Sequence, residues 1–280
     1  MARAEERGGP APRRRSGGRG RRLLAAALLA VASGAAVAHE FWLVPHAAQA
    51  EPGEQVVLEL RIGPHWPGVQ TARLPNLFGG FVMRDAIGQL PVEGRDGALA
   101  VGHVRLRAPG AAIIALRTNP ARLQLPGADF DQYLKEEGLL DVLDFRRKNG
   151  LQNQSGRELF SRCAKTIVLA GASSAGFNQA MHLPLELVPV DDPLRFQARR
   201  PYTVQLMLNG APLPGALIKA QLKGPRPLEL SAVSDRRGMV SLALPAGGLW
   251  LFNAVHMEST MDNAADWEST WASLTMELPR

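Results

Sequence analysis

Six histidines are the side chains of this 280-residue sequence best suited to hold a transition metal. Neutral imidazole is the commonest nitrogen ligand for nickel, cobalt, copper and zinc. No two of them have the spacing of a helical His-x-x-x-His pair, so a metal site would be assembled from distant parts of the chain. The six are His39, His46, His65, His103, His182 and His256.

His39 stands out because the sequence before it predicts that it becomes an amino-terminal residue. Six arginines between positions 13 and 22 precede a short apolar core at 23–31, and Ala36-Val37-Ala38 supplies the small residues that a signal peptidase reads. We predict that residues 1–38 are a cleaved signal peptide and that the mature chain is periplasmic. The apolar core is too short to span a bilayer, and both the general secretory and the twin-arginine routes stay open.

An amino-terminal histidine offers two nitrogen donors on one residue, the free amine and the ring, and these can chelate one metal ion. We therefore predict His39 as the first ligand and His256 as its leading partner. The alternative for His39 is a residue simply exposed at the terminus. The alternative for His256 is a core histidine that is hydrogen-bonded to a backbone carbonyl. The further candidate ligands are His46, Glu258 and Asp262.

Charge and cysteine content exclude two other classes of partner. The eight arginines and two glutamates before residue 39 account for the whole formal net charge of +6. A mature chain without excess positive charge lacks the main support for nucleic-acid binding. Cys163 is the sole cysteine, so we expect no disulfide partner and a buried, apolar role for its side chain.

Short alternating segments separated by Gly and Pro turns predict an all-β protein built from β-sandwiches. In residues 39–190 they suggest a first sandwich, with a helical insert at about 126–156, where apolar residues take helical spacing. Asp191-Asp192-Pro193 marks a domain boundary, and residues 191–280 suggest a second sandwich. The strands expected are 39–44, 55–62, 80–84, 98–107, 111–118, 157–170, 183–190, 202–208, 216–222, 240–244 and 249–257.

Two other groups of residues have structural interpretations. Trp267 and Trp271 could line a groove, but packing in a core is the commoner use of such rings. Glu158 lies among Arg157, Arg162 and Lys165, and this spacing predicts ion pairs on a strand surface.

Several segments together resemble one exported bacterial family, the domain of unknown function numbered 4198. They are His39 to Leu43, Gly156 to Lys165, Leu183 to Pro189, Trp250 to His256, and Asp266 to Thr275. The family is labelled as a periplasmic component of cobalt or nickel uptake, which implies metal handling together with inner-membrane transporter subunits. Cys163 and Met276 depart from the residues expected at those positions.

A second resemblance covers residues 198–258. The segment from Asn209 to Ala216, followed by Asp235 to Gly238 and a last apolar strand, is similar to carboxypeptidase regulatory-like domains. This resemblance implies an immunoglobulin-like or transthyretin-like sandwich and carries no catalytic role.

Three functions follow from these observations. The first is a periplasmic protein that binds nickel, cobalt or copper for uptake or delivery. The second is a metal-free binding or scaffold module of the cell envelope. The third is a copper-dependent oxidase with a histidine-brace site. We assign no catalytic residue, because the sequence lacks the Gly-x-Ser-x-Gly, phosphate-loop and His-Glu-x-x-His motifs.

Overall fold

The element at the centre of the fold is β10 (Gly156–Ala170), a strand of 15 residues. Ile167 and Leu169 point into one hydrophobic core, whereas Ala164 and Val168 point into another. Alternation of side chains along a strand explains this division, because neighbouring residues lie on opposite faces. The computed structural model describes residues 40–225 and 228–280, so the predicted signal peptide and His39 lie outside the described residues.

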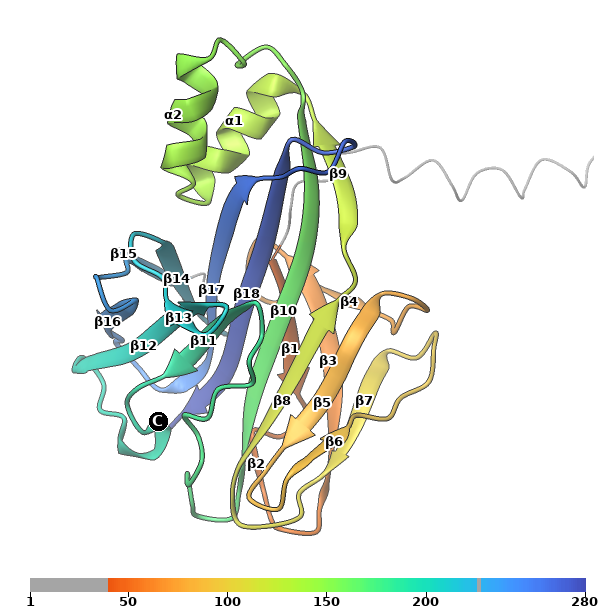
Figure 1. Cartoon of the computed structure of the whole chain (residues 1–280). Coiled ribbons are helices and arrows are strands. Elements are labelled where there is room, and N and C mark those ends of the chain that lie inside the picture. The colour runs from red at the N-terminus through yellow and green to blue at the C-terminus, as the bar shows by residue number, and fades with distance from the viewer. Residues whose placement is uncertain (1–39, 226–227) are drawn as a thin grey trace, which may run out of the picture. The chain divides into compact units, whose positions relative to one another are not determined.

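β10 belongs to a ten-stranded central sheet that runs in the order β15-β14-β17-β18-β10-β8-β5-β6, with β2 and β9 also paired to β10. The pairing of β10 with β18 is parallel, and the long strands lie side by side in Figure 1. The other strands of this sheet are β2 (Gln49–Ala50), β5 (Phe78–Arg84), β6 (Gln89–Pro91), β8 (Gly110–Thr118), β9 (Ala121–Leu125), β14 (Leu217–Leu222), β15 (Glu229–Val233), β17 (Gly248–Ser259) and β18 (Trp267–Leu278).

A smaller antiparallel sheet, the β1 sheet, packs on one face of the central sheet. Its strand β3 pairs with the other three, and Phe41 and Leu43 of its first strand enter the core shared with β5, β8 and β10. The strands are β1 (Glu40–Pro45), β3 (Gln55–Gly63), β4 (Val69–Thr71) and β7 (Ala100–Arg105).

A third sheet, the β12 sheet, packs on the opposite face of the central sheet. Tyr202, Val204 and Leu206 meet Trp250 and Phe252 in that core. Its strands are β11 (Leu185–Pro189), β12 (Pro201–Leu208), β13 (Ala211–Pro212) and β16 (Met239–Ala243), and a short 3-10 helix, η1 (Pro193–Arg195), lies between β11 and β12.

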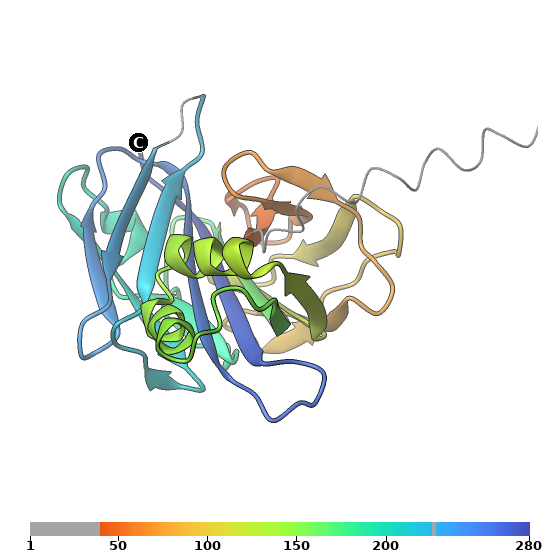
Figure 2. The ribbon, with the colours of Figure 1, turned by 90° about the horizontal axis from the view of Figure 1, so that it is seen from above.

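The two helices α1 (Gly127–Glu136) and α2 (Leu140–Lys148) connect β9 to β10. Tyr133 stacks on Trp271 with ring centroids 5.9 Å apart, and Phe145 meets Trp267 edge-on at 5.6 Å. Figures 1 and 2 show the helices against the ends of β17 and β18. The predicted packing role of the two tryptophans is confirmed, since both are buried in this cluster.

The β1 sheet and the helices cover different stretches of the same face. On β18, Ser273 and Thr275 donate hydrogen bonds to the β1 carbonyls of Phe41 and Leu43. Trp267 and Trp271, at positions of the same parity, pack against the helices. The amino end of β1 and the helical insert therefore approach each other over one face of the central sheet.

The predicted all-β class, with sandwich packing and a helical insert, is confirmed. The central sheet takes strands from both sides of the predicted boundary at residues 190 and 191, and that division stays a prediction. Within the described residues, no helix is both long and apolar enough to cross a membrane.

Candidate functional site

A group of polar and charged side chains lies on this face of the central sheet, between the amino end of β1 and the helical insert. We call it the polar seam. Electrostatic interactions link its members from Arg162 through Glu158, Tyr133 and Glu137 to Lys219 and Glu40. Its members are Glu40, Tyr133, Glu137, Glu158, Arg162, Lys219, Asn253 and Ser269.

At one end of the seam, Lys219 of β14 lies beside the buried carboxylate of Glu40 and the half-buried carboxylate of Glu137. Its Nζ lies 2.8 Å from Glu137 Oε2 and 3.8 Å from Glu40 Oε1. Gln221 Nε2, two residues along the same strand, donates to Glu40 Oε2 at 3.2 Å and to Glu229 Oε2 at 2.9 Å. Three carboxylates therefore gather around one ammonium group and one amide.

The pKa values of the two glutamates beside Lys219 are set first by burial. Burial raises the pKa of Glu40 well above its ordinary value, although the Lys219 ammonium opposes this effect. Burial also raises the pKa of Glu137. For Lys219, burial disfavours the ammonium, but the carboxylates of Glu137 and Glu40 outweigh it and raise the pKa. An additional cation near Glu40 would stabilise the ionised carboxylates.

At the other end, Glu158 of β10 is a buried carboxylate with hydrogen bonds to only one of its two oxygens. Its Oε1 accepts hydrogen bonds from Ser269 Oγ and, at 3.2 Å, from the Tyr133 hydroxyl. Trp271 Nε1 donates in turn to Ser269 Oγ at 3.2 Å. Burial raises the pKa of Glu158, and the hydrogen bonds and the positive charge of Arg162 counteract this only in part.

Asn253 of β17 lies between these two ends and has neither amide atom paired. Asn253 is paired with Lys219 on the neighbouring strand β14 and with Ser273 on the neighbouring strand β18. Its side chain therefore lies on the same face of the sheet as theirs. Both Asn253 Oδ1 and Nδ2 are buried without a hydrogen-bond partner, and so is Glu158 Oε2. Unpaired buried polar atoms are rare and usually mark a functional group, a water or an ion.

The structure brings two of the four described candidate ligands together. His256 Nε2 lies 3.9 Å from Glu258 Oε2 near the end of β17. His46 Nε2 bonds to Glu59 Oε1 at 2.7 Å just after β1. Asp262 accepts from Arg122 at 3.1 Å.

His256 and the seam belong to opposite faces of the central sheet. Along β17, His256 has the parity of Phe252 and Ala254, which face the β12 sheet. Asn253 has the opposite parity and lies opposite Lys219. His46 follows the far end of β1, about 20 Å along an extended strand from Glu40. His39 lies outside the described residues.

The described residues contain no group of three or more His, Cys, Asp or Glu side chains arranged to hold a metal ion. Glu40 and Glu137 are already shared with Lys219, and Glu158 stands alone as an acid at its end of the seam. A metal bound in the seam would therefore need donors from a residue outside the described range.

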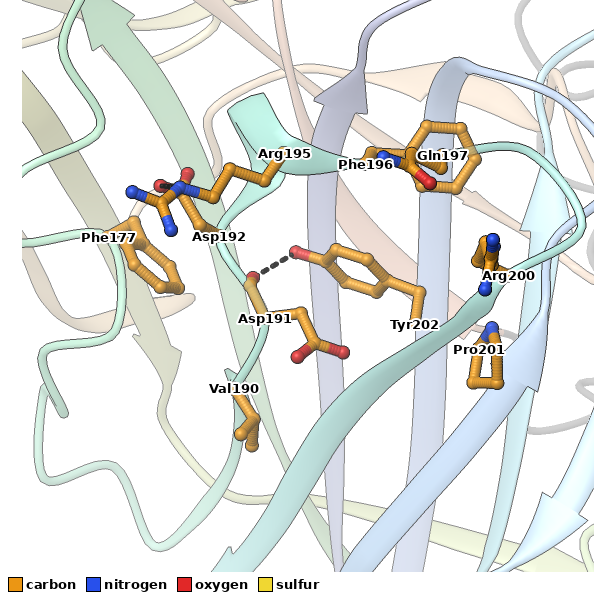
Figure 3. Close-up of a pocket in the computed structure, with 10 residues that line it drawn as sticks. All are labelled: Phe177, Val190, Asp191, Asp192, Arg195, Phe196, Gln197, Arg200, Pro201 and Tyr202. Atoms are coloured by element: carbon orange, nitrogen blue, oxygen red, sulfur yellow. Dashed lines mark hydrogen bonds and ion pairs between the residues drawn. The ribbon is translucent and has the colours of Figure 1, made fainter.

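Several hollows lie outside the seam, and two of them have polar linings relevant to function. One of about 410 Å³ is lined by Trp66 and Gln221 and by His65, whose Nδ1 lies 3.7 Å from Glu229 Oε2. The other, of about 660 Å³, is drawn in Figure 3. In this hollow the Tyr202 hydroxyl donates a hydrogen bond to the Asp191 carbonyl. The Asp191 carboxylate accepts another from the Thr203 N–H. These polar groups therefore stabilise the connection between β11 and β12.

The prediction of surface ion pairs for Glu158 and Lys165 is wrong. Glu158 is 1% exposed and bonds to Ser269 and Tyr133, while Lys165 is 1% exposed and pairs with Glu186. Their strand is covered on both faces, and a single strand cannot show that from its own sequence. The sequence reasoning also missed Glu137, Lys219 and Asn253, because no local motif connects them.

Comparison with known proteins supplies one family and several distant structures. The family model described as "Domain of unknown function (DUF4198)" matches residues 36–258. A search of curated proteins found no match.

Three of the solved structures that resemble the chain share little sequence with it. The D0-D1 domain of intimin has 13% identity and a TM-score of 0.21, over 86% of this chain and 98% of that one. A tetra-tandem repeat from the extending region of a large adhesion protein has 10% identity and a TM-score of 0.23, over 86% and 49%. Escherichia coli alpha-2-macroglobulin activated by porcine elastase has 11% identity and a TM-score of 0.20, over 86% and 24%.

Proposed function

Because the chain belongs to the DUF4198 family, whose description names no function, we propose a function from the site itself: an exported, periplasmic protein that binds nickel, cobalt or copper. The metal is held by His39 once removal of residues 1–38 has made it the first residue. Binding of this kind suits uptake or delivery of the metal, with inner-membrane transporter subunits as partners.

The observation that carries this proposal is the environment of Glu40, the residue joined to His39. Glu40 is 4% exposed and lies beside Lys219, with Glu137 and Glu229 close by. Three carboxylates and one ammonium leave this region short of positive charge. Because residue 39 is covalently joined to Glu40, a cation chelated by residue 39 would be held next to these carboxylates.

The chemistry of the donors supports a first-row transition metal. Amine and imidazole nitrogens together with carboxylate oxygens suit divalent nickel, cobalt and copper, with copper the tightest by the general affinity order. His256, Glu258, His46 and Asp262 stay as candidates from the sequence. The seam carboxylates are favoured as ligands over them, because they lie beside the residue that follows His39.

Titration of the mature protein tests the proposal. Protein beginning at His39 is titrated with Cu(II), Ni(II) and Co(II) by calorimetry, beside a variant with one additional alanine before His39. The additional residue converts the free amine to an amide and removes one chelate donor, so we expect affinity to fall about 100-fold or more. Equal affinity for the two proteins would contradict the proposal, whereas no measurable binding by either protein would favour a metal-free scaffold module.

The export step has its own measurement. Intact mass of the protein recovered from the periplasm reports the cleavage site, and metal analysis of the same sample reports the ion. A measured mass that corresponds to a chain beginning at any residue other than His39 would contradict the proposed chelating terminus.

A further inference from the structure

The central sheet has an open edge where β14 ends before β17 does. β17 pairs with β14 only as far as Ala254. Its pairing with β18 on the other side continues to Ser259. Among the residues that the structure describes, the end of β17 at 255–259 therefore has a strand on one side only. We call this stretch the open edge of β17.

The main-chain groups of Met257 point out of this edge. The Lys223 N–H donates to the Leu249 carbonyl on the β14 side of β17, and the Thr260 N–H donates to the Asp266 carbonyl on the β18 side. Main-chain groups alternate between the two sides of a strand, so the odd-numbered residues of β17 direct theirs toward the β14 side. No described strand lies on that side of Met257, and no other described residue forms a hydrogen bond with its N–H or carbonyl.

The chain before β14 turns away from β17, which leaves this edge open. Gly215, with a φ of 77°, donates its N–H to the Ser234 carbonyl at 3.0 Å, and the Ala216 N–H donates to Ser234 Oγ at 3.0 Å. Both bonds hold the segment beside the end of β15, so it does not follow β17. On the other side of the edge, Gly138 of the helical insert packs closely on Leu217, where an added Cβ would stand 2.7 Å from Leu217 Cβ. The helical insert and the turn before β14 therefore form two walls of a recess.

A hollow of about 530 Å³ lies at the open edge, and it is lined by Val255, His256 and Met257 of β17. This volume is in the range of sites that hold small ligands or short peptide segments. Leu140 and Val233, which also line the hollow, are 55% and 61% exposed although both are large apolar side chains. Apolar residues of the two walls are Leu139, Leu140, Val142, Leu213, Pro214 and Leu217.

A short extended peptide suits this recess better than a second folded chain does. Open strand edges bind extended segments through main-chain hydrogen bonds, and pockets for side chains add specificity. A stable interface between two copies buries at least about 1,200 Å² in total. Val255 and Met257 are only 3% and 5% exposed, so the edge lies deep between its walls and the edge of another sheet would not reach it.

We propose that the open edge of β17 binds an extended segment of a partner protein by β-strand addition. The main chain of the partner pairs with Met257, and its apolar side chains contact Leu140 and Val233 in the hollow. The partner is thus recognised as an extended chain that carries apolar side chains. This inference goes beyond the proposed function and does not depend on metal binding.

The test uses mature protein, residues 39–280, with a chelator present so that metal binding plays no part. A peptide is selected from a random heptapeptide library displayed on phage and is titrated into isotope-labelled protein. We expect the amide resonances of Met257 and Ser259 in NMR spectra to shift more than those of residues elsewhere. Methylating each peptide nitrogen in turn should lower the affinity about 10-fold at alternate positions, because only every second N–H of an added strand faces β17.

A pair of protein variants tests the apolar wall of the hollow. Leu140→Ser removes an exposed apolar side chain from the wall, so the affinity for the selected peptide should fall about 10-fold. Val69→Ser is the matched control, because Val69 is a 69% exposed residue of β4 in the β1 sheet, and its affinity should equal that of the unmodified protein.

Three results would overturn the inference. The first is that no peptide is selected. The second is an affinity that is indifferent to nitrogen methylation and to Leu140→Ser. The third is self-association of the peptide-free protein through the Met257 amide, which would assign the open edge to a second copy of the chain.

Discussion

Lys165 and Glu186 form an ion pair inside the core between the central sheet and β11. Their Nζ and Oε1 atoms are 2.7 Å apart, and Glu186 also accepts from the backbone N–H groups of Met181 and Leu183. Burial lowers the pKa of Lys165, although the Glu186 carboxylate opposes this effect. Such a pair adds little net stability compared with apolar residues, but removal of one partner is costly. The pair connects β11 to β10 across the core.

Cys163 also lies on β10, and its burial makes the thiol unreactive. The side chain is 2% exposed, and burial raises the pKa of its thiol to about 11. The thiolate is therefore scarce at neutral pH, which agrees with the apolar role expected from the sequence.

Asp85 provides a prediction for stability against pH. Burial disfavours its charged form, but hydrogen bonds from Arg107 and from the Ile87 and Gly88 N–H groups outweigh this and lower its pKa. A lowered folded pKa stabilises the fold above the unfolded value of about 4, and this contribution is lost as pH falls through the folded pKa. Asp85→Asn should cost about 2 kcal/mol at pH 7 by urea unfolding.

Measurements at several pH values distinguish loss of the Asp85 charge from a general loss of packing in the variant. The difference in free energy of unfolding between Asp85→Asn and the unmodified protein should shrink as pH is lowered from 6 to 3. A difference that stays constant over that range would show that the Asp85 charge is not responsible.

The element that links the helical insert to the central sheet is β10, which begins immediately after the insert. Its first residue, Gly156, lies under the fully buried ring of Phe130 from α1. A Cβ at Gly156 would stand 2.2 Å from Phe130 Cγ, so the helix and the strand approach more closely than any side chain allows. Glycine at this position lets α1 cover the end of the seam.

Gly156→Ala should therefore destabilise the protein. Displacement of the Phe130 ring should cost about 1–3 kcal/mol in the free energy of unfolding, as other overpacked cores show. Gly80→Ala on β5 is the control, because no atom lies within 4 Å of the added carbon and its φ is not positive. Equal changes in the two variants, measured by urea unfolding, would contradict this account.

The whole molecule depends on one sheet that joins both halves of the chain. β18 pairs with β10 over nine residues, from Glu158 with Trp267 to Thr166 with Thr275. The β12 sheet then packs on a core that contains Ile113 and Ile167 from the first half as well as Trp250 and Phe252 from the second. The second half buries its apolar face against strands that precede residue 190.

A fragment of residues 191–280 should therefore fail to fold alone. Without β10, β18 loses its parallel partner, and without β8, β10 and β11 the core of the β12 sheet is exposed. We expect little chemical-shift dispersion in NMR spectra of this fragment, whereas residues 39–280 give a dispersed spectrum. A dispersed spectrum and a cooperative melt for the fragment would support an independent second domain at the predicted boundary.

The sequence by itself determined the local structure. Alternation in Gln55–Gly63 and Pro201–Leu208 and helical spacing near Phe130 and Tyr133 predicted elements that the fold contains, because burial of one face imposes a period of two or 3.6 on the chain. The prediction that His39 becomes the amino-terminal residue and supplies two nitrogen donors rests on the sequence alone.

Only the tertiary structure decided which side chains meet. These side chains come from the start of β1, the residue after α1, and the strands β10, β14 and β17: Glu40, Glu137, Glu158, Lys219 and Asn253. Parity along a strand shows which residues share a face, but the order of the strands and the layer above them decide what that face contacts. The seam forms because β1 and the helical insert pack beside each other on one face of the central sheet, and that packing depends on contacts between residues far apart in the sequence.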